Sequence, residues 1–238
     1  MTDAHCHVTG GDPSVREFLI GRDFIGVHPW ESGEADSCPL HLGKSGQETA
    51  SPFSRMAGLR ESLVADSRLG VGEIGLDRLK DRIISPCMRE TFEAQLRLAA
   101  EFRRPVVLHG AKCWGQVVRT VQRLTIEQSN NPNNRTIPSF LFHGFSRSDG
   151  LIPDIVALNG SISVGPAVLN DHAVNYRELV KKIPIDRLLI ETDRTPENAA
   201  DCPSVREVAA EVAKLRGMTI VELERITDQN AERFLNLI

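Results

Sequence analysis

Residues 71–77 read Val-Gly-Glu-Ile-Gly-Leu-Asp, and this stretch decides the fold class. Its side chains are apolar almost throughout, which is typical of a parallel strand covered on both faces. One carboxylate, Glu73, stands inside the run, where an unpaired charge would be costly. The stretch therefore predicts a buried strand whose acid either serves a functional site or is held by buried hydrogen bonds.

Six further short apolar runs are spaced along the chain with helix-like segments between them. Many end in a polar residue, and they cover residues 3–8, 24–27, 105–109, 138–143, 160–164 and 187–191. Three pairs place a capping side chain before a proline suited to the first helical turn: Asp12-Pro13, Ser51-Pro52 and Ser85-Pro86. Apolar residues recur at helical spacing in residues 88–102 and 114–124, so each predicts a helix with one face in the core.

Alternating strands and helices indicate either a doubly wound sheet or a (β/α) barrel. No GxGxxG turn follows the first strand, and the polar residues gather at strand ends, where a barrel builds its active site. We therefore expect an α/β fold, a TIM-type (β/α) barrel that spans residues 1–238 as a single domain. Residues 31–50 and 130–135 lack periodicity and are predicted to be loops.

The composition excludes several classes of protein. A net charge of −4 argues against a strongly basic nucleic-acid coat. No apolar stretch approaches the roughly 20 residues of a membrane helix, and the first residues lack a secretory signal. Five scattered cysteines without a CxxC pair argue against a disulfide framework or a zinc knuckle. We expect a cytoplasmic protein with no membrane association and no obligate protein partner.

The first run contains His5-Cys6-His7, which alone has three interpretations: a metal-ligand pair, a Cys/His redox fragment, or a chance feature of a loose terminus. Residues two apart in a strand face the same side, so the two imidazoles project together and the thiol points away. This alternation weakens the redox interpretation, but a lone HxH remains a weak signal.

The other runs strengthen the metal interpretation. Glu73 lies in one run, two more end with His109 and His143, and Asp193 follows the last run by two residues. Any one of these is explained by a buried polar residue that finds hydrogen bonds, but five strands doing so is hard to explain by packing. Four imidazoles and two carboxylates match the donors that zinc, manganese or nickel accept. Six donors exceed the need of one tetrahedral ion, so two ions bridged by a carboxylate are expected.

The sequence resembles the TatD family of metal-dependent hydrolases, within the amidohydrolase-like group of barrels. The matching motifs occur in family order from end to end of the chain. They are DAHCH (3–7), GVHP (26–29), VGEIGLD (71–77), PVVLH (105–109), HGFS (143–146), SVGP (163–166), LLIETD (188–193) and NAERFL (230–235).

The resemblance implies two divalent ions, Mg²⁺, Mn²⁺ or Zn²⁺. His5, His7 and Asp193 would hold one ion, His109 and His143 the other, and Glu73 would bridge them. It also implies that water activated by the ions attacks a phosphodiester, with Asp193 accepting a proton. The family typically acts as a DNase of the 3′-5′ exonuclease type, so the expected substrate is a nucleic acid or a small phosphodiester.

Four residues are candidate substrate contacts. His28 is expected near the metals as a phosphate contact, with a buried structural histidine as the alternative. Lys112, Arg147 and Arg194 follow strand ends and could contact phosphate, or they are ordinary solvated charges.

Four other polar residues and one thiol receive smaller roles. Asp3 and Glu191 are expected to support the ligands from below. His41 and His172 are expected to be exposed, and Cys113 receives no role.

The chain departs from the family between His7 and His28, where family members have room for one more strand–helix unit. We therefore expect a shortened barrel of seven strands. Gly110-Ala111-Lys112 and the residues after Asp193 also depart from the family pattern. Two alternatives thus stay open: a hydrolase of a carboxylic ester or amide, and a non-catalytic barrel that binds metal.

Overall fold

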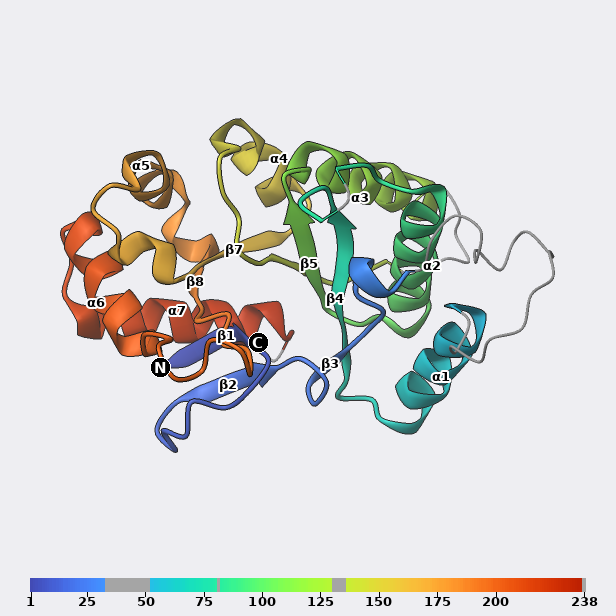
Figure 1. The fold of residues 1–238 in the computed structure, drawn as a ribbon, viewed down its shortest axis with the longest axis horizontal. Helices are drawn as coiled ribbons and strands as arrows, with labels where there is room; N and C mark the ends of the chain where they lie inside the picture. Colours follow the sequence, from blue (N-terminus) through green and yellow to red (C-terminus); the bar gives the residue numbers. More distant parts are fainter. Residues whose placement is uncertain (33–51, 81, 130–135, 237–238) are drawn as a thin grey trace. The chain divides into compact units, whose positions relative to one another are not determined.

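Parallel strands alternate with helices in both of the compact units into which the chain divides, residues 1–23 with 139–238 and residues 24–138 (Figure 1). The computed structural model describes residues 1–32, 52–80, 82–129 and 136–236. Every recorded strand pair is parallel. The expected α/β class is therefore confirmed, and the expectation of one domain stays a prediction.

The unit formed by residues 24–138 carries three strands paired in chain order, with helices beside them. Its strands are β3 (Phe24–Ile25), β4 (Gly70–Asp77) and β5 (Val106–Ala111), and its helices are η1 (Pro29–Glu31), α1 (Pro52–Ala65), α2 (Pro86–Phe102) and α3 (Trp114–Ser129). Helix α2 packs on β4, and α3 packs on β5 and β4. The predicted inward faces are confirmed, since Phe92, Leu96 and Val117 are at most 1% exposed.

In the other unit β1 (Thr2–Cys6) pairs with β2 (Arg16–Leu19), and β7 (Gly160–Val164) lies between β6 (Phe140–Phe142) and β8 (Leu188–Ile190) and pairs with both. Its helices are α4 (Ile152–Ala157), α5 (Val174–Lys182), α6 (Val205–Arg216) and α7 (Ile220–Phe234), with the short turns η3 (Asp149–Leu151), η4 (Pro166–Leu169) and η5 (Ile185–Arg187). Strand β1 contacts β8, and α7 packs on both. Cys6 is fully buried, in keeping with its predicted orientation away from the imidazoles.

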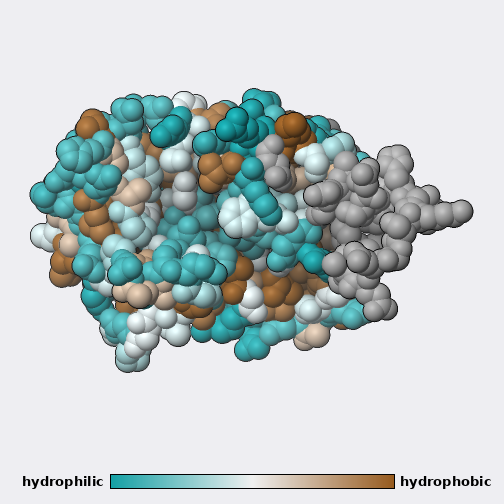
Figure 2. All heavy atoms as spheres, in the orientation of Figure 1, coloured by the Kyte–Doolittle hydropathy of each residue, from teal (hydrophilic) through white to brown (hydrophobic). Residues whose placement is uncertain are grey.

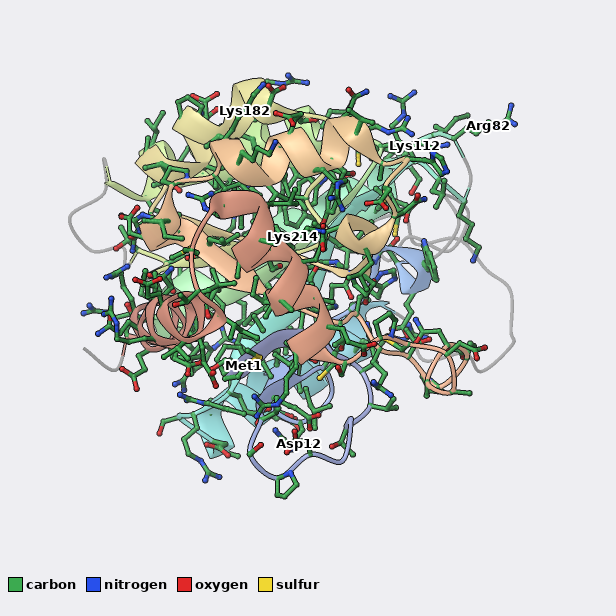
Figure 3. The ribbon with its side chains drawn as sticks, turned by 90° about the vertical axis from the view of Figure 1, so that its left-hand side faces the viewer. Met1, Asp12, Arg82, Lys112, Lys182 and Lys214 are labelled. Atoms are coloured by element: carbon green, nitrogen blue, oxygen red, sulfur yellow. The ribbon has the colours of Figure 1, made fainter. Side chains whose placement is uncertain are left out.

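Strand β2 was not predicted, and the helix start inferred from Asp12-Pro13 is wrong. Asp12 instead lies in a loop (Figure 3) and closes a turn there. Its carboxylate accepts hydrogen bonds from the backbone N–H and the hydroxyl of Ser14 at 2.9 and 2.6 Å. The chain then runs directly into β2, where Phe18 is buried beside Phe234 of α7, with ring centroids 6.3 Å apart. All seven predicted strands are present, and the β1–β2 connection lacks a helix.

The other two proline signals do mark helices. Ser85 caps α2, since its hydroxyl accepts a hydrogen bond from the Met88 N–H at 3.0 Å. Helix α1 begins at Pro52, while Ser51 lies outside the described residues. Most of the predicted loop 31–50, including His41, and the whole of 130–135 also lie outside them.

Two further features of the described residues concern membrane-spanning helices and cysteines. Among the residues placed by the structure, no helix combines the length and apolar character needed to cross a membrane. Cys6, Cys113 and Cys202 are free cysteines. The face in Figure 2 is mainly hydrophilic, with apolar side chains in separate small patches.

Candidate functional site

The end of β1 is joined to the segment after β8 by a set of backbone and side-chain hydrogen bonds. The Asp193 N–H donates to the His5 carbonyl at 3.0 Å, and the His7 N–H donates to the Arg194 carbonyl at 2.7 Å. Asp3 accepts from the Thr192 N–H at 3.0 Å and from its hydroxyl at 2.6 Å. Asp3 therefore supports the segment that carries Asp193, in keeping with its predicted supporting role. Burial raises the pKa of Asp3 to about 6.

These bonds bring His5, His7 and Asp193 into one cluster. Nε2 of His5 and Nε2 of His7 lie 3.4 and 3.7 Å from Oδ1 of Asp193. Each residue offers one donor atom, and the three atoms lie within 4.8 Å of one another. Two imidazoles and a carboxylate are donors that fit a divalent transition metal. His5 is fully buried and the Asp193 side chain is 48% exposed, so the cluster is reached from the Asp193 side.

His143 and Glu191 lie beside this cluster. The His143 ring stacks on His5, with centroids 4.0 Å apart. Glu191 accepts hydrogen bonds from the Gly144 N–H at 2.7 Å and from the Ser163 hydroxyl at 2.5 Å, and its Oε2 lies 4.0 Å from Nδ1 of His143. Burial raises the pKa of Glu191 to about 8. Glu191 therefore supports the turn after β6 more closely than the histidine ring.

A second cluster lies in the unit formed by residues 24–138. Oε1 of Glu73 on β4 lies 2.5 Å from Nδ1 of His109 on β5 and 3.6 Å from Nε2 of His28. Donor atoms of all three residues lie within 4.8 Å of one another. Neighbouring parallel strands place Glu73 and His109 side by side, and the turn after β3 adds His28. His28, predicted as a phosphate contact or a buried structural histidine, therefore also has the position of a metal donor.

Asp77 is a site residue that sequence reasoning missed. Its Oδ2 accepts hydrogen bonds from Nε2 of His109 and from the Trp30 indole, both at 2.9 Å. Its Oδ1 accepts from the N–H groups of Leu79 and Lys80. Burial would raise the pKa of Asp77, but these hydrogen bonds lower it well below its usual range.

His109 is held between two carboxylates. Burial would lower its pKa, but the bonds to Asp77 and Glu73 raise it to about 9. A signal for Asp77 was present in the sequence, since it follows Glu73 by four residues and therefore faces the same side of the strand.

The predicted cationic contacts have different surroundings. Lys112 is exposed directly after β5 (Figure 3). The Arg194 guanidinium donates to the carbonyls of Ala199 and Cys202 at 2.9 and 3.2 Å, which holds the loop after β8. Their roles as phosphate contacts stay predictions.

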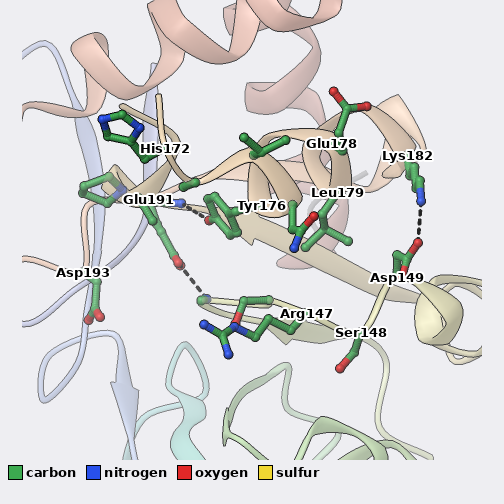
Figure 4. A pocket seen from close by; sticks show the side chains of 18 of the residues that line it. Arg147, Ser148, Asp149, His172, Tyr176, Glu178, Leu179, Lys182, Glu191 and Asp193 are labelled. Carbon is green, nitrogen blue, oxygen red and sulfur yellow. Dashed lines mark hydrogen bonds and ion pairs between the residues drawn. The ribbon is translucent and has the colours of Figure 1, made fainter. Parts of the chain in front are cut away.

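Arg147 lines a pocket of about 1090 Å³ that also includes Asp193, Tyr176 and the exposed His172 (Figure 4). Lys182 in the same pocket is paired with Asp149 at 2.5 Å. The Arg147 guanidinium has no hydrogen bond or ion pair with the residues described. Arg147 is thus the lining cation with charge available for an anionic ligand near Asp193.

Comparisons with known proteins find relatives among metal-dependent hydrolases. A family model described as TatD related DNase matches residues 21–236. The uncharacterized metal-dependent hydrolase YabD of Bacillus subtilis is 30% identical over 189 residues, which is 76% of this chain and 71% of the relative. The 3'-5' ssDNA/RNA exonuclease TatD of Erwinia billingiae is 32% identical over 213 residues, or 84% of this chain and 75% of the relative.

A solved structure shares the fold. The crystal structure of YJJV, a TatD homolog from Escherichia coli, superposes with a TM-score of 0.67 and 22% identity. The superposition covers 95% of this chain and 78% of that protein.

Proposed function

Because the chain belongs to the TatD-related DNase family of metal-dependent hydrolases, we propose that it cleaves phosphodiester bonds of single-stranded nucleic acid from the 3′ end. The observation that carries this proposal is the pair of three-donor clusters, each built from imidazoles and one carboxylate. The relative named as a 3'-5' ssDNA/RNA exonuclease supports the choice of substrate and polarity.

Divalent ions bound at these clusters would supply Lewis acidity toward a phosphoryl group and toward water. His5 and His7 would hold one ion together with Asp193, and His28, Glu73 and His109 offer donors for another. That Glu73 is shared between two ions, that His143 is a ligand, and that the ions are Mg²⁺, Mn²⁺ or Zn²⁺ stay predictions.

The protein's own groups would orient the substrate and move the proton. The half-exposed carboxylate of Asp193 is open to the pocket, so it can take a proton from an attacking water, as general bases do. Arg147 would offer its guanidinium to a phosphate oxygen, since it has no partner in the described part of the chain. The predicted cytoplasmic location stays a prediction.

Stripping and reloading the metal tests the proposal. Purified protein is dialysed against chelator, reloaded with Mg²⁺, Mn²⁺ or Zn²⁺, and given single-stranded DNA labelled at the 3′ or the 5′ end. We expect cleavage that requires metal and releases the 3′ label first.

Asp193→Ala should lower kcat by roughly 100-fold or more, the usual contribution of a positioned base. The matched control is Asp171→Ala, since Asp171 is 85% exposed and outside the donor clusters. Hydrolysis of carboxylic esters or amides without phosphodiester cleavage would favour the alternative hydrolase. Bound metal without turnover on any of these substrates would favour the non-catalytic barrel.

A further inference from the structure

Trp30 is an exposed aromatic side chain with an anchored edge. It lies in η1 and is 53% exposed, and it is the one aromatic residue among the large exposed hydrophobic side chains that the structure describes. Its indole N–H donates to Oδ2 of Asp77 at 2.9 Å, and the same oxygen accepts from Nε2 of His109. Asp77 is 1% exposed, so the indole is tied to a buried carboxylate that also holds His109 of the candidate metal cluster.

Two further contacts fix the ring. His28 meets it edge-on, with centroids 4.8 Å apart and planes at 79°, while Nδ1 of His28 accepts the Trp30 backbone N–H at 3.2 Å. The Lys80 ammonium lies 5.9 Å from the ring centroid, within the range of a cation–π contact. A solvent-exposed tryptophan that had no function at this place would not need its orientation set from the indole edge, the backbone and the ring.

We propose that Trp30 is a stacking platform for a nucleobase of the substrate, with Lys80 beside it for the adjoining phosphate. The inference rests on the proposed function, because it names the part of a nucleic-acid substrate that would bind beside the cluster of His28, Glu73 and His109. Every nucleobase has a π face, and stacking on an exposed aromatic side chain changes affinity by about 5- to 150-fold per base.

The platform makes the site dependent on bases yet tolerant of their identity. Stacking reads neither donors nor acceptors on the base edge, so the four bases should bind with similar affinity. A backbone without bases, or an aliphatic ester, offers nothing to stack. Substrate preference should therefore follow the presence of a base more than its sequence.

Intrinsic fluorescence gives a test that is independent of turnover. The chain has two tryptophans, and Trp114 is 5% exposed, so a stacking ligand should quench Trp30 selectively. The probes are a tetradeoxyadenylate with phosphorothioate linkages and an abasic tetramer with the same backbone. Each is titrated into the wild-type protein in Mg²⁺ and again in EDTA.

Three variants separate stacking from support of Asp77. Trp30→Phe keeps a ring but loses the N–H, Trp30→Ala loses both, and Ile126→Ala removes an exposed side chain (62%) on α3 as the control. Because the Trp30 variants lack the reporting tryptophan, the affinity of each variant for the probes is measured by fluorescence anisotropy of labelled probes. We expect Trp30→Ala to weaken binding of the base-containing probe about 10-fold or more, Trp30→Phe to keep most of the affinity, and the abasic probe to be unaffected by either.

The outcomes distinguish this inference from the proposed function. Equal binding and equal quenching by both probes, equal losses in Trp30→Phe and Trp30→Ala, or no quenching by either probe would each overturn the platform. Base-dependent quenching without phosphodiester cleavage would leave the platform standing and remove the nuclease. The same two tetramers are also made with ordinary phosphodiester linkages. If wild type and Trp30→Ala cleave both of them at equal rates, the nuclease stands and the platform is overturned.

Discussion

The Asp77→Asn substitution tests how a buried carboxylate controls metal affinity at a neighbouring histidine. Oδ1 of Asp77 accepts two backbone N–H groups, and Oδ2 accepts Nε2 of His109 and the Trp30 indole. An asparagine has one side-chain carbonyl oxygen, so it can accept from only one of these two sets of donors. Its NH₂ group must then face the N–H donors of the other set. If the oxygen stays on the backbone side, the imidazole loses its charged acceptor.

The size of the effect follows from that lost contact. A hydrogen bond to a charged group contributes about 1.5–3 kcal/mol, and replacing partners that orient metal-binding histidines typically costs about 10–100-fold. We therefore expect Asp77→Asn to weaken metal binding at the cluster of His28, Glu73 and His109 by about 10–100-fold, while the bonds to Leu79 and Lys80 limit damage to the fold.

Competition with a chelator of known affinity measures this change for Zn²⁺ and Mn²⁺. Asp66→Asn is the matched control, because it removes one carboxylate charge from an exposed Asp66–Arg68 pair in the same unit. Thermal unfolding of both variants checks that the fold is intact. Metal affinity of Asp77→Asn within about twofold of wild type would refute the assignment of Asp77 as the residue that orients His109.

Two further substitutions test the pocket and the N-terminal strands. Arg147→Ala should raise KM for a phosphodiester about 10-fold and leave kcat nearly unchanged. Lys182→Ala should have little effect, because Lys182 is already paired with Asp149. An unchanged KM of Arg147→Ala in steady-state kinetics would show that Arg147 does not bind substrate. Phe18→Ala should lower the free energy of unfolding by about 3–5 kcal/mol, since Phe18 is 3% exposed, while Val221→Ala, 71% exposed, should change it little. Urea unfolding followed by circular dichroism measures both, and equal midpoints would show that β2 adds no core.

The strands could be predicted from the sequence because they depend on a local pattern of apolar residues. Apolar runs predicted β1, β4, β5 and the later strands, and alternation correctly set the imidazoles of His5 and His7 on one side of β1. Strand β2 was missed because Asp-Pro reads equally well as a helix start or as a turn. What decided between them is the packing of Phe18 against Phe234, a contact distant in sequence.

Parts of the candidate site depend on contacts that a local pattern does not contain. The donor position of His28 follows from its approach to Glu73, which lies on another strand. The bond from Trp30 to Asp77 spans 47 positions and leaves no periodic trace. Asp77 could have been predicted from the sequence, since strand alternation places it on the same face as Glu73. It was missed because it stands at the end of the apolar run, whereas Glu73 stands inside it.

The join between β1 and the segment after β8 has a consequence for synthesis of the chain. Asp3 and Thr192 are 189 positions apart, so the first strand leaves the ribosome long before its partners exist. At a translation rate of about 5–20 residues per second, Asp193 is synthesised roughly 10–40 seconds after His5 and His7. A metal ion captured early would be held there by two imidazoles alone and would stay exchangeable, so metal choice at this cluster would be settled only once Asp193 has been synthesised and has joined the two histidines.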